Sequence, residues 1–483
     1  MRRPAVRRRW LRSRQAEELL MTNASAETLR DSRGLRLGTA SRVAADRADE
    51  ALWQMMTFAD TPRLALQAAR EADGGWVLPL LLDAGFRLGL NQPDDRAAAR
   101  DLLESAAALA SRGTTRERAH LEALVKLQDG RVSAALRLWD DLLLEHPRDA
   151  LALHWAHQWD HARGDSASMR LRPARALPEW DDTDPLFPCV LGLYAFGLAE
   201  CHQLSLAEDL GRRAIALAQE QRPDPASPAG VPWAVHAVTH AMEMQGRFDD
   251  GAIWLRQQQA SWTDGTRFAS HLWWHLALFR LEALDITGAL RLVDTHLSGA
   301  ALTHGLQCVD AAALYWRLRV MDVEVDALFK DLLQRWMPDP DQAGVHAFTD
   351  WHVVLTMLGA GERAQAEGWV ARCAERVMRA EEGARSNHAV ARDLGLPLMR
   401  ALLASERGES DAAVRGLYLV HESAARLGGS HVRRDLVAQT LMHCAATSKL
   451  PHIGRALLNE RCLAKPVTPL TRHWAGKLNV AIA

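Results

Sequence analysis

The sequence predicts an all-α fold in which helix-turn-helix repeats stack into an α-solenoid with a right-handed superhelix. Its 483 residues are 48% hydrophobic and 24% charged, which is the composition of a folded chain. Glycine-containing turns recur along the chain, and no segment shows the two-residue alternation of a β-strand. We therefore interpret residues 21–483 as one superhelical domain rather than as several globular domains.

The first 20 residues differ from the rest, because seven arginines and two glutamates give them a net charge of +5. Such a segment is either a basic arm for an anionic surface or an extension created by a start codon placed upstream of Met21. We favour the extension, since the body of the chain does not continue the basic character. Nucleic acid is therefore not an expected partner.

The clearest repeats cover residues 116–183. The first begins at Arg116, turns at Gly130, places Ala134 and Ala135 where two helices would touch, and ends at Pro147. This order matches the 34-residue tetratricopeptide pattern, and Gly164 follows Gly130 at the same interval. The sequence therefore predicts tetratricopeptide-type repeats.

The later repeats are less regular, with intervals of roughly 37–47 residues, which helical repeat families tolerate. We expect their turns at His202, Gly246, Leu284, Gly361 and Gly408, with another near Met321. Proline-rich segments at 173–188 and 222–232 are interpreted as excursions between repeats, placed to cover one mouth of the groove.

Histidines concentrate in the repeats at 232–298. His236, His240 and Glu243 are spaced along one stripe of a first helix, and His271 and His275 repeat the four-residue spacing on the next first helix. We expect both stripes to face the concave groove as neighbours. These five residues predict either acid–base catalytic groups or ligands of a divalent transition metal, and the sequence does not decide between them.

Other polar and aromatic side chains are expected near this stripe. The ligand-binding candidates on the groove helices and their ends are His154, His157, Trp233, Trp274, Asp294, His296, Asp350 and His352. For His157 a hydrogen-bonding role in packing is favoured, and most of the 17 tryptophans are expected to fill the core.

Several segments are similar to those of the tetratricopeptide repeat protein 38 family. Residues 233–246, 271–278 and 294–296 resemble its central motifs, and residues 391–398, 427–435 and 457–461 resemble its C-terminal motifs. The resemblance covers roughly residues 31–475, leaves Met1–Leu20 without a counterpart, and supports the repeat fold without a biochemical role. It implies that Asp310, Asp393, Arg434 and Asp435 occupy motif positions. We include Asp393, Arg434 and Asp435 among the ligand-binding candidates. We omit His431, because a smaller residue is expected at that position.

Two functions follow. The first is a protein that binds a ligand or a protein partner in a concave groove lined by His, Glu, Asp and Trp, as repeat grooves commonly do. The alternative is a small-molecule enzyme of the hydrolase or lyase type that uses the groove histidines and Glu243. Because the irregular repeats carry the histidines, a closed superhelix around a polar pocket is favoured over an open ribbon.

The six cysteines are widely spaced, form no CxxC pair, and are expected to be buried thiols. No apolar stretch reaches the length of about 18 residues that a membrane helix requires. We therefore expect a cytoplasmic protein without a membrane partner.

Overall fold

The computed structural model describes residues 29–90, 92–221, 230–336 and 339–482. These residues form an all-helical protein, and the extended pairing among them is limited to isolated bridges between Arg30 and Arg36 and between Ala59 and Thr266. The expectations for residues 1–20, for Met21 and for residues 222–229 lie outside the described part. None of the helices in that part combines the length and apolarity needed to cross a membrane.

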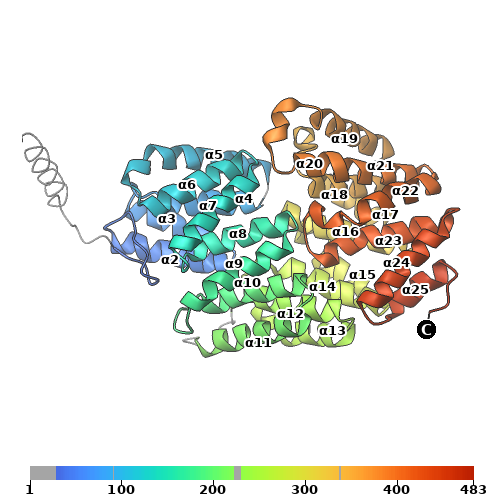
Figure 1. The fold of residues 1–483 in the computed structure, drawn as a ribbon, viewed down its shortest axis with the longest axis horizontal. Coiled ribbons are helices and arrows are strands. Elements are labelled where there is room, and N and C mark those ends of the chain that lie inside the picture. The colour runs from blue at the N-terminus through green and yellow to red at the C-terminus, as the bar shows by residue number, and fades with distance from the viewer. Residues whose placement is uncertain (1–28, 91, 222–229, 337–338, 483) are drawn as a thin grey trace, which may run out of the picture.

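Most helices form pairs that are consecutive in sequence, joined by short turns (Figure 1). The N-terminal pairs are α2 (Arg42–Met56) with α3 (Pro62–Ala72), α4 (Leu78–Leu90) with α5 (Pro93–Ala108), α6 (Thr115–Gln128) with α7 (Val132–Glu145), and α8 (Ala150–Ala162) with α9 (Ser166–Ala176). The middle pairs are α10 (Phe187–Glu200) with α11 (Leu204–Glu220), α12 (Pro232–Met244) with α13 (Phe248–Gln257), α14 (Ala269–Glu282) with α15 (Ile286–His296), and α16 (Gly305–Val320) with α17 (Asp326–Arg335). The C-terminal part holds α18 (Ala347–Gly359), α19 (Arg363–Arg376), the short α20 (His388–Val390), α21 (Leu396–Glu406), α22 (Ser410–His421), α23 (His431–Thr447), α24 (Pro451–Ala464) and α25 (Pro469–Lys477).

The predicted turns coincide with residues in the left-handed backbone region, which ends a first helix and lets the chain reverse. Glycine fills this position at most of them, for example Gly246 with φ of 69°. His202, Leu284 and Asp322 adopt it without glycine, at φ of 59°, 56° and 66°. The turn geometry is therefore kept even where the residue that favours it is absent.

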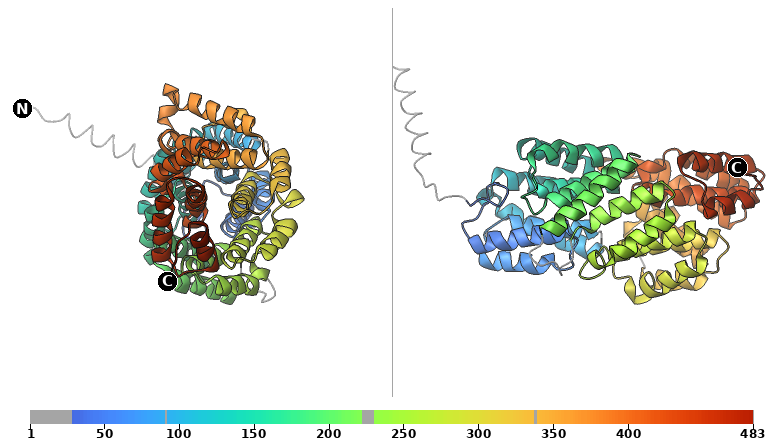
Figure 2. Two further views of the ribbon diagram at one scale, coloured as in Figure 1. Left: turned by 90° about the vertical axis from the view of Figure 1, so that its right-hand side faces the viewer. Right: turned by 90° about the horizontal axis from the view of Figure 1, so that it is seen from below.

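The two helices of a pair differ in burial. Every residue of α12 from Pro232 to Glu243 is buried, whereas α13 buries only Gly251, Trp254 and Leu255. The first helices α10, α16 and α18 are likewise buried along nearly their whole length. The first helices thus form an inner layer and the second helices an outer one (Figure 2).

The proline-rich segment 173–188 differs from the expected excursion. Pro173 lies inside α9, and Pro188 lies in the first turn of α10, where its missing N–H has no helical partner to lose. The non-helical part is thereby shortened, and a one-turn 3-10 helix at Leu177–Glu179 lies within it.

The late part of the chain packs against the early part. The Gly429 N–H donates to the His161 carbonyl (3.0 Å), and the Ser386 N–H donates to the Gly130 carbonyl (2.9 Å). A Cβ at Gly164 would overlap the Ala425 carbonyl, so this approach requires glycine. Helix α23 also contacts α12 and α16, and α25 contacts α14. The helices therefore close on themselves around a centre, as the left view of Figure 2 shows.

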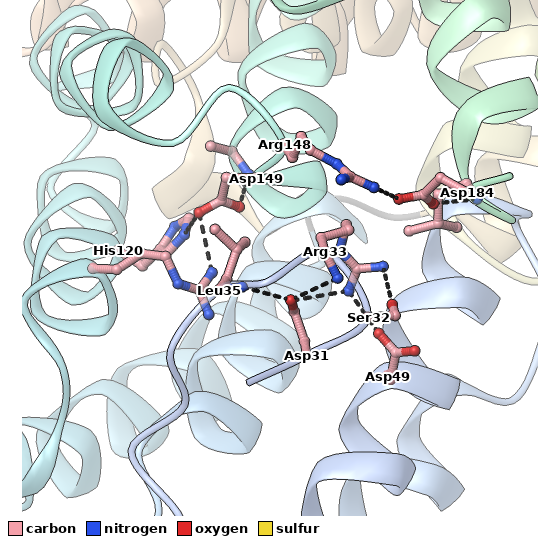
Figure 3. Close-up of polar contacts among 12 residues, drawn as sticks. Asp31, Ser32, Arg33, Leu35, Asp49, His120, Arg148, Asp149 and Asp184 are labelled. Carbon is pink, nitrogen blue, oxygen red and sulfur yellow. Dashed lines mark hydrogen bonds and ion pairs between the residues drawn. The ribbon is translucent and has the colours of Figure 1, made fainter. Parts of the chain in front are cut away.

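Separate groups of polar contacts lie at the N-terminal end of this body (Figure 3). Arg33 forms ion pairs with Asp31 (3.1 Å) and Asp49 (2.6 Å). Asp149, at the start of α8, accepts from Arg116 (3.1 Å) and lies 2.9 Å from His120 Nε2. Burial acts to raise the pKa of Asp149, but His120 and Arg116 outweigh it and hold that pKa far below its usual range.

The six cysteines are free thiols, and Cys189, Cys308, Cys373 and Cys444 are buried, while Cys201 and Cys462 are partly buried.

Candidate metal centre

Four histidines from two inner helices converge in the interior. His236 and His240 come from α12, His271 and His275 come from α14, and each offers a nitrogen within 4.8 Å of the others. His236 Nε2 and His271 Nε2 lie 3.1 Å apart. The two histidine pairs predicted to be neighbours are thus side by side; we call these four residues the four-histidine cluster.

Local helix geometry accounts for this convergence. Residues four apart lie on one face of a helix, so each pair presents both imidazoles in the same direction. Pro232 occupies the first turn of α12, which it favours because it needs no N–H partner there. His236, His240 and His275 are at most 2% exposed, because α12 and α14 belong to the inner layer.

Three of the four histidines have a carboxylate behind the ring, at Nδ1. Asp310 Oδ2 on α16 lies 2.7 Å from His271 Nδ1, and Glu243 Oε2 lies 3.2 Å from His275 Nδ1. Glu200 Oε1, at the end of α10, lies 3.3 Å from His240 Nδ1. A carboxylate at Nδ1 fixes the tautomer that leaves Nε2 free to bind a metal.

The cluster contains buried nitrogens that lack hydrogen-bond partners in the described part of the chain. They are Nε2 of His240 and His275, and Nδ1 of His236 and His240. His240 Nδ1 belongs to this set because its 3.3 Å approach to Glu200 lacks hydrogen-bond geometry. A buried polar atom without a partner costs about 1–3 kcal/mol, so several together indicate a ligand. A metal ion bound by the inward-facing nitrogens would satisfy His240 and His275.

His236, His271 and His275 have the protonation state that metal binding requires. Burial, reinforced by the neighbouring histidines, lowers the pKa of His236 and of His275 well below the usual range. Burial also lowers the pKa of His271, against the opposing effect of Asp310. These three rings are therefore neutral near pH 7, the form that donates a lone pair to a metal.

The three carboxylates behave differently. Burial alone would raise the pKa of Glu200, but His240, His431 and Arg434 bring it down to about 2. Burial also opposes ionisation of Asp310, yet Arg433 and His271 lower its pKa to about 2. For Glu243 burial prevails over the nearby Lys465 and raises the pKa to about 8.

Arg433 and aromatic rings enclose the cluster. Arg433 donates to Asp310 Oδ1 at 2.7 Å, and its guanidinium lies 3.3 Å from His271 Nδ1. The predicted residue Trp274 stacks on His271 at 5.3 Å between ring centroids, and the predicted residue Trp233 lies 4.8 Å from His236. His271 is the most accessible of the four, with 11% of its side chain exposed.

The other predicted ligand-binding residues lie around the cluster or away from it. Arg434 reaches it indirectly, through an ion pair with Glu200 at 3.5 Å. His157 packs its ring on Trp233 at 5.7 Å, and both of its buried nitrogens lack hydrogen-bond partners among the described residues, contrary to the expected hydrogen-bonding role. His154 contacts the ring of Phe58 instead, 5.9 Å between centroids.

The remaining candidates have partners of their own. Asp435 pairs with Arg461 at 2.6 Å, and Asp393 is exposed and pairs with Arg392 at 2.7 Å. His296 stacks on Trp273 at 3.9 Å between centroids and lies at the end of α15, which also carries Asp294. In α18, Asp350 accepts from Trp369 Nε1 at 3.0 Å, and His352 Nδ1 lies 2.7 Å from the Phe348 carbonyl.

Sequence reasoning missed Glu200, Arg433 and His431, and it left Asp310 out of the site although the resemblance placed Asp310 on a motif position. The backbone N–H of His431 donates to Glu200 Oε2 at 3.0 Å. The predicted site omits His431, because a smaller residue is expected at that position. Glu200 had a readable signal, because it is the only charged residue of the apolar helix α10, and a buried charge requires a partner. Arg433 had no comparable signal in the sequence, because it lies 162 residues from His271 and repeat spacing does not relate the two positions.

No protein-family model matches this sequence, so comparison assigns neither the repeat type nor the site.

Proposed function

We propose that this protein is a metal-binding helical-repeat protein. In this proposal a tetratricopeptide-type right-handed superhelix closes on itself, holds one divalent transition-metal ion at the four-histidine cluster, and binds a small molecule beside that ion. The observation that carries the proposal is the convergence of four imidazoles, three of them with a carboxylate at Nδ1.

The repeat type is supported by the left-handed turns at Gly130 and Gly164, which keep the 34-residue interval, and by the inner and outer layers of helices. The free cysteines are compatible with a reducing compartment, which supports the cytoplasm as the location.

The donor set favours a transition metal over calcium or magnesium. Imidazole nitrogens suit Zn²⁺, Fe²⁺, Ni²⁺ and Cu²⁺, whereas Ca²⁺ and Mg²⁺ prefer oxygen ligands. The carboxylates act on the imidazoles rather than on the ion, an arrangement that typically contributes 10–100-fold in metal affinity.

The burial of the cluster favours a small molecule over an extended peptide as its ligand. The accessible side of His271, next to Arg433, gives the direction from which a ligand would approach. Four bound imidazoles would fill a tetrahedral Zn²⁺ ion, so catalysis would require a five- or six-coordinate ion or a histidine that does not bind. The alternative function, a hydrolase or lyase, would use this same site, where a bound ion would polarise a carbonyl or activate water.

Metal analysis of the purified full-length protein tests the proposal. We expect about one equivalent of metal in the wild type and in the control variant His452→Ala, whose histidine is exposed on α24. His240→Ala and His275→Ala should lose the metal while keeping the helical circular-dichroism spectrum. Wild-type protein that remains metal-free after incubation with Zn²⁺, Fe²⁺, Ni²⁺ and Cu²⁺ would refute the metal site.

A further inference from the structure

A second internal site lies apart from the four-histidine cluster. A cavity of about 200 Å³ opens between the N-terminal half, at the end of α4 and start of α5, and the C-terminal half, at the starts of α16 and α18. Its walls include Arg96, Val309, Trp336, His346, Asp350 and Trp369, and none of the four clustered histidines. We call it the seam cavity, because it lies where the two halves meet.

Arg96 brings to this cavity a positive charge that no ion pair compensates within the described residues. Its guanidinium makes one hydrogen bond among these residues, a long one to the Gln128 carbonyl at 3.5 Å. The wall also holds Asp339 and Arg335, and Arg335 is paired with Asp331. Burial lowers the pKa of Arg96, and the nearby cations Arg385 and Arg100 lower it further. A partly buried guanidinium surrounded by like charges favours an anion as its missing partner.

Two further polar groups in the wall lack partners. Asp350 is 2% exposed; its Oδ1 accepts from Trp369 and from the Gly344 N–H, but its Oδ2 has no hydrogen-bond partner in the described part of the chain. Nδ1 of His346 is also buried without a partner there. Burial raises the pKa of Asp350 to about 7 and lowers that of His346 to about 4. Near neutral pH, the carboxyl group can therefore donate a hydrogen bond without placing a full negative charge against an anion.

Apolar surface completes the site. The rings of Trp336 and Trp369 and the side chain of Val309 line the same cavity. Tryptophan walls suit a flat apolar body, and a few convergent polar groups then fix its orientation. The cavity thus combines a place for a negative charge with a place for a ring.

We propose that the seam cavity binds a small organic monoanion, a carboxylate carried on an aromatic or apolar body, with Arg96 pairing with the carboxylate and Asp350 and His346 supplying further hydrogen bonds. The site is independent of the proposed metal centre, because the two share no residue. The seam cavity would thus give this chain a second ligand, which is recognised by charge and shape rather than by metal coordination.

Calorimetric titration of the full-length protein with benzoate tests this proposal. The titrations are performed on the wild-type protein with a chelator present, so that binding to a metal cannot contribute. We expect saturable binding of benzoate, and binding at least tenfold weaker for the neutral analogue benzamide. Failure of the metal proposal would leave these results unchanged.

Arg96→Gln, made in the same background, should weaken benzoate binding at least tenfold, and Arg96→Lys should weaken it less, since a single charge remains. Arg63→Gln is the control, because Arg63 is exposed on α3, which contributes no residue to the cavity, and it should bind as the parent does. Equal binding by Arg96→Gln and its parent, or no benzoate binding by the parent protein, would overturn the proposal. If Arg96→Gln does not fold, Arg96→Lys provides the test, and benzoate binding by Arg96→Lys as tight as that by the parent would overturn the proposal. The proposal would also be overturned if the parent bound benzamide as tightly as benzoate.

Discussion

Glu243→Gln separates metal coordination from folding better than substitution of a histidine does. Glu243 Oε2 lies 3.2 Å from His275 Nδ1, and no Arg or Lys of the described residues forms an ion pair with it. Because burial raises the pKa of Glu243 to about 8, its carboxyl group is mainly protonated at pH 7 in the metal-free protein. The amide therefore replaces a neutral group of the same shape, and we expect the free energy of unfolding to change by less than about 1 kcal/mol.

Metal binding should be affected much more. In the metal complex His275 donates its Nδ1 proton, and a carboxylate is a stronger acceptor than an amide. We expect the affinity for Zn²⁺ to fall by about 10–100-fold, equivalent to about 1.4–2.8 kcal/mol. Since the Glu243 carboxyl becomes charged only as the pH approaches its pKa of about 8, the wild-type affinity should rise between pH 6 and pH 8 more steeply than that of the variant.

The assay is competition for Zn²⁺ against a chromophoric chelator, combined with urea unfolding of the metal-free proteins. Glu460→Gln is the control, because the Glu460 side chain is 63% exposed on α24. Unchanged zinc affinity in Glu243→Gln would refute the role given to this carboxylate. A loss of more than about 3 kcal/mol in metal-free stability would show instead that Glu243 holds an ion pair in the interior.

The fold itself gives further predictions. The pKa of Asp350, raised to about 7, means that the folded state binds this proton more tightly than the unfolded state, so stability present at low pH is lost as pH rises to 7. Between pH 5 and 8 urea unfolding should show a loss of about 3 kcal/mol in the wild type that Asp350→Asn lacks, and parallel profiles would contradict this. Asp149→Ala should cost about 3–5 kcal/mol in the same measurement, because it leaves a buried arginine unpaired; a cost below 1 kcal/mol would argue against the ion pair of Arg116 with Asp149. Gly85→Ala should destabilise by about 1–3 kcal/mol, since its Cβ would overlap the ring of Trp155, whereas Gly368→Ala, in open space within α19, should stabilise by about 0.5–1 kcal/mol. Thermal unfolding distinguishes these two signs, and shifts in the same direction would be inconsistent with the packing described. If the metal site exists, Zn²⁺ at 100 times its Kd should stabilise the wild type by about 2.7 kcal/mol, and no shift in midpoint would count against it.

The parts of the structure that could be predicted from sequence are those fixed by local geometry. The turn positions follow from glycine and from repeat spacing, even at Leu284, where glycine is missing. The approach of His236 to His271 follows from two four-residue spacings on consecutive first helices. Neither required knowledge of how distant segments of the chain meet.

The rest depends on closure between distant segments. Arg433 reaches Asp310 only because α23 packs against α16, and the spacing of the repeats does not encode that contact. The scattered ligand-binding candidates Asp294 and Asp393 illustrate the same limit, since motif membership does not specify which residues meet in space. The two unpartnered groups of the seam cavity, on Asp350 and His346, likewise become visible only when burial is known.

The contact of Gly429 with the His161 carbonyl can form only after residue 429 has been synthesised. His236 through His275 are complete long before residue 429 has left the ribosome, and the interval amounts to roughly 8–30 s at about 5–20 residues per second. During that time the four imidazoles cannot yet be covered by α23. A chain shortened at its C-terminus would therefore expose its innermost histidines, whereas an open repeat array would only become shorter.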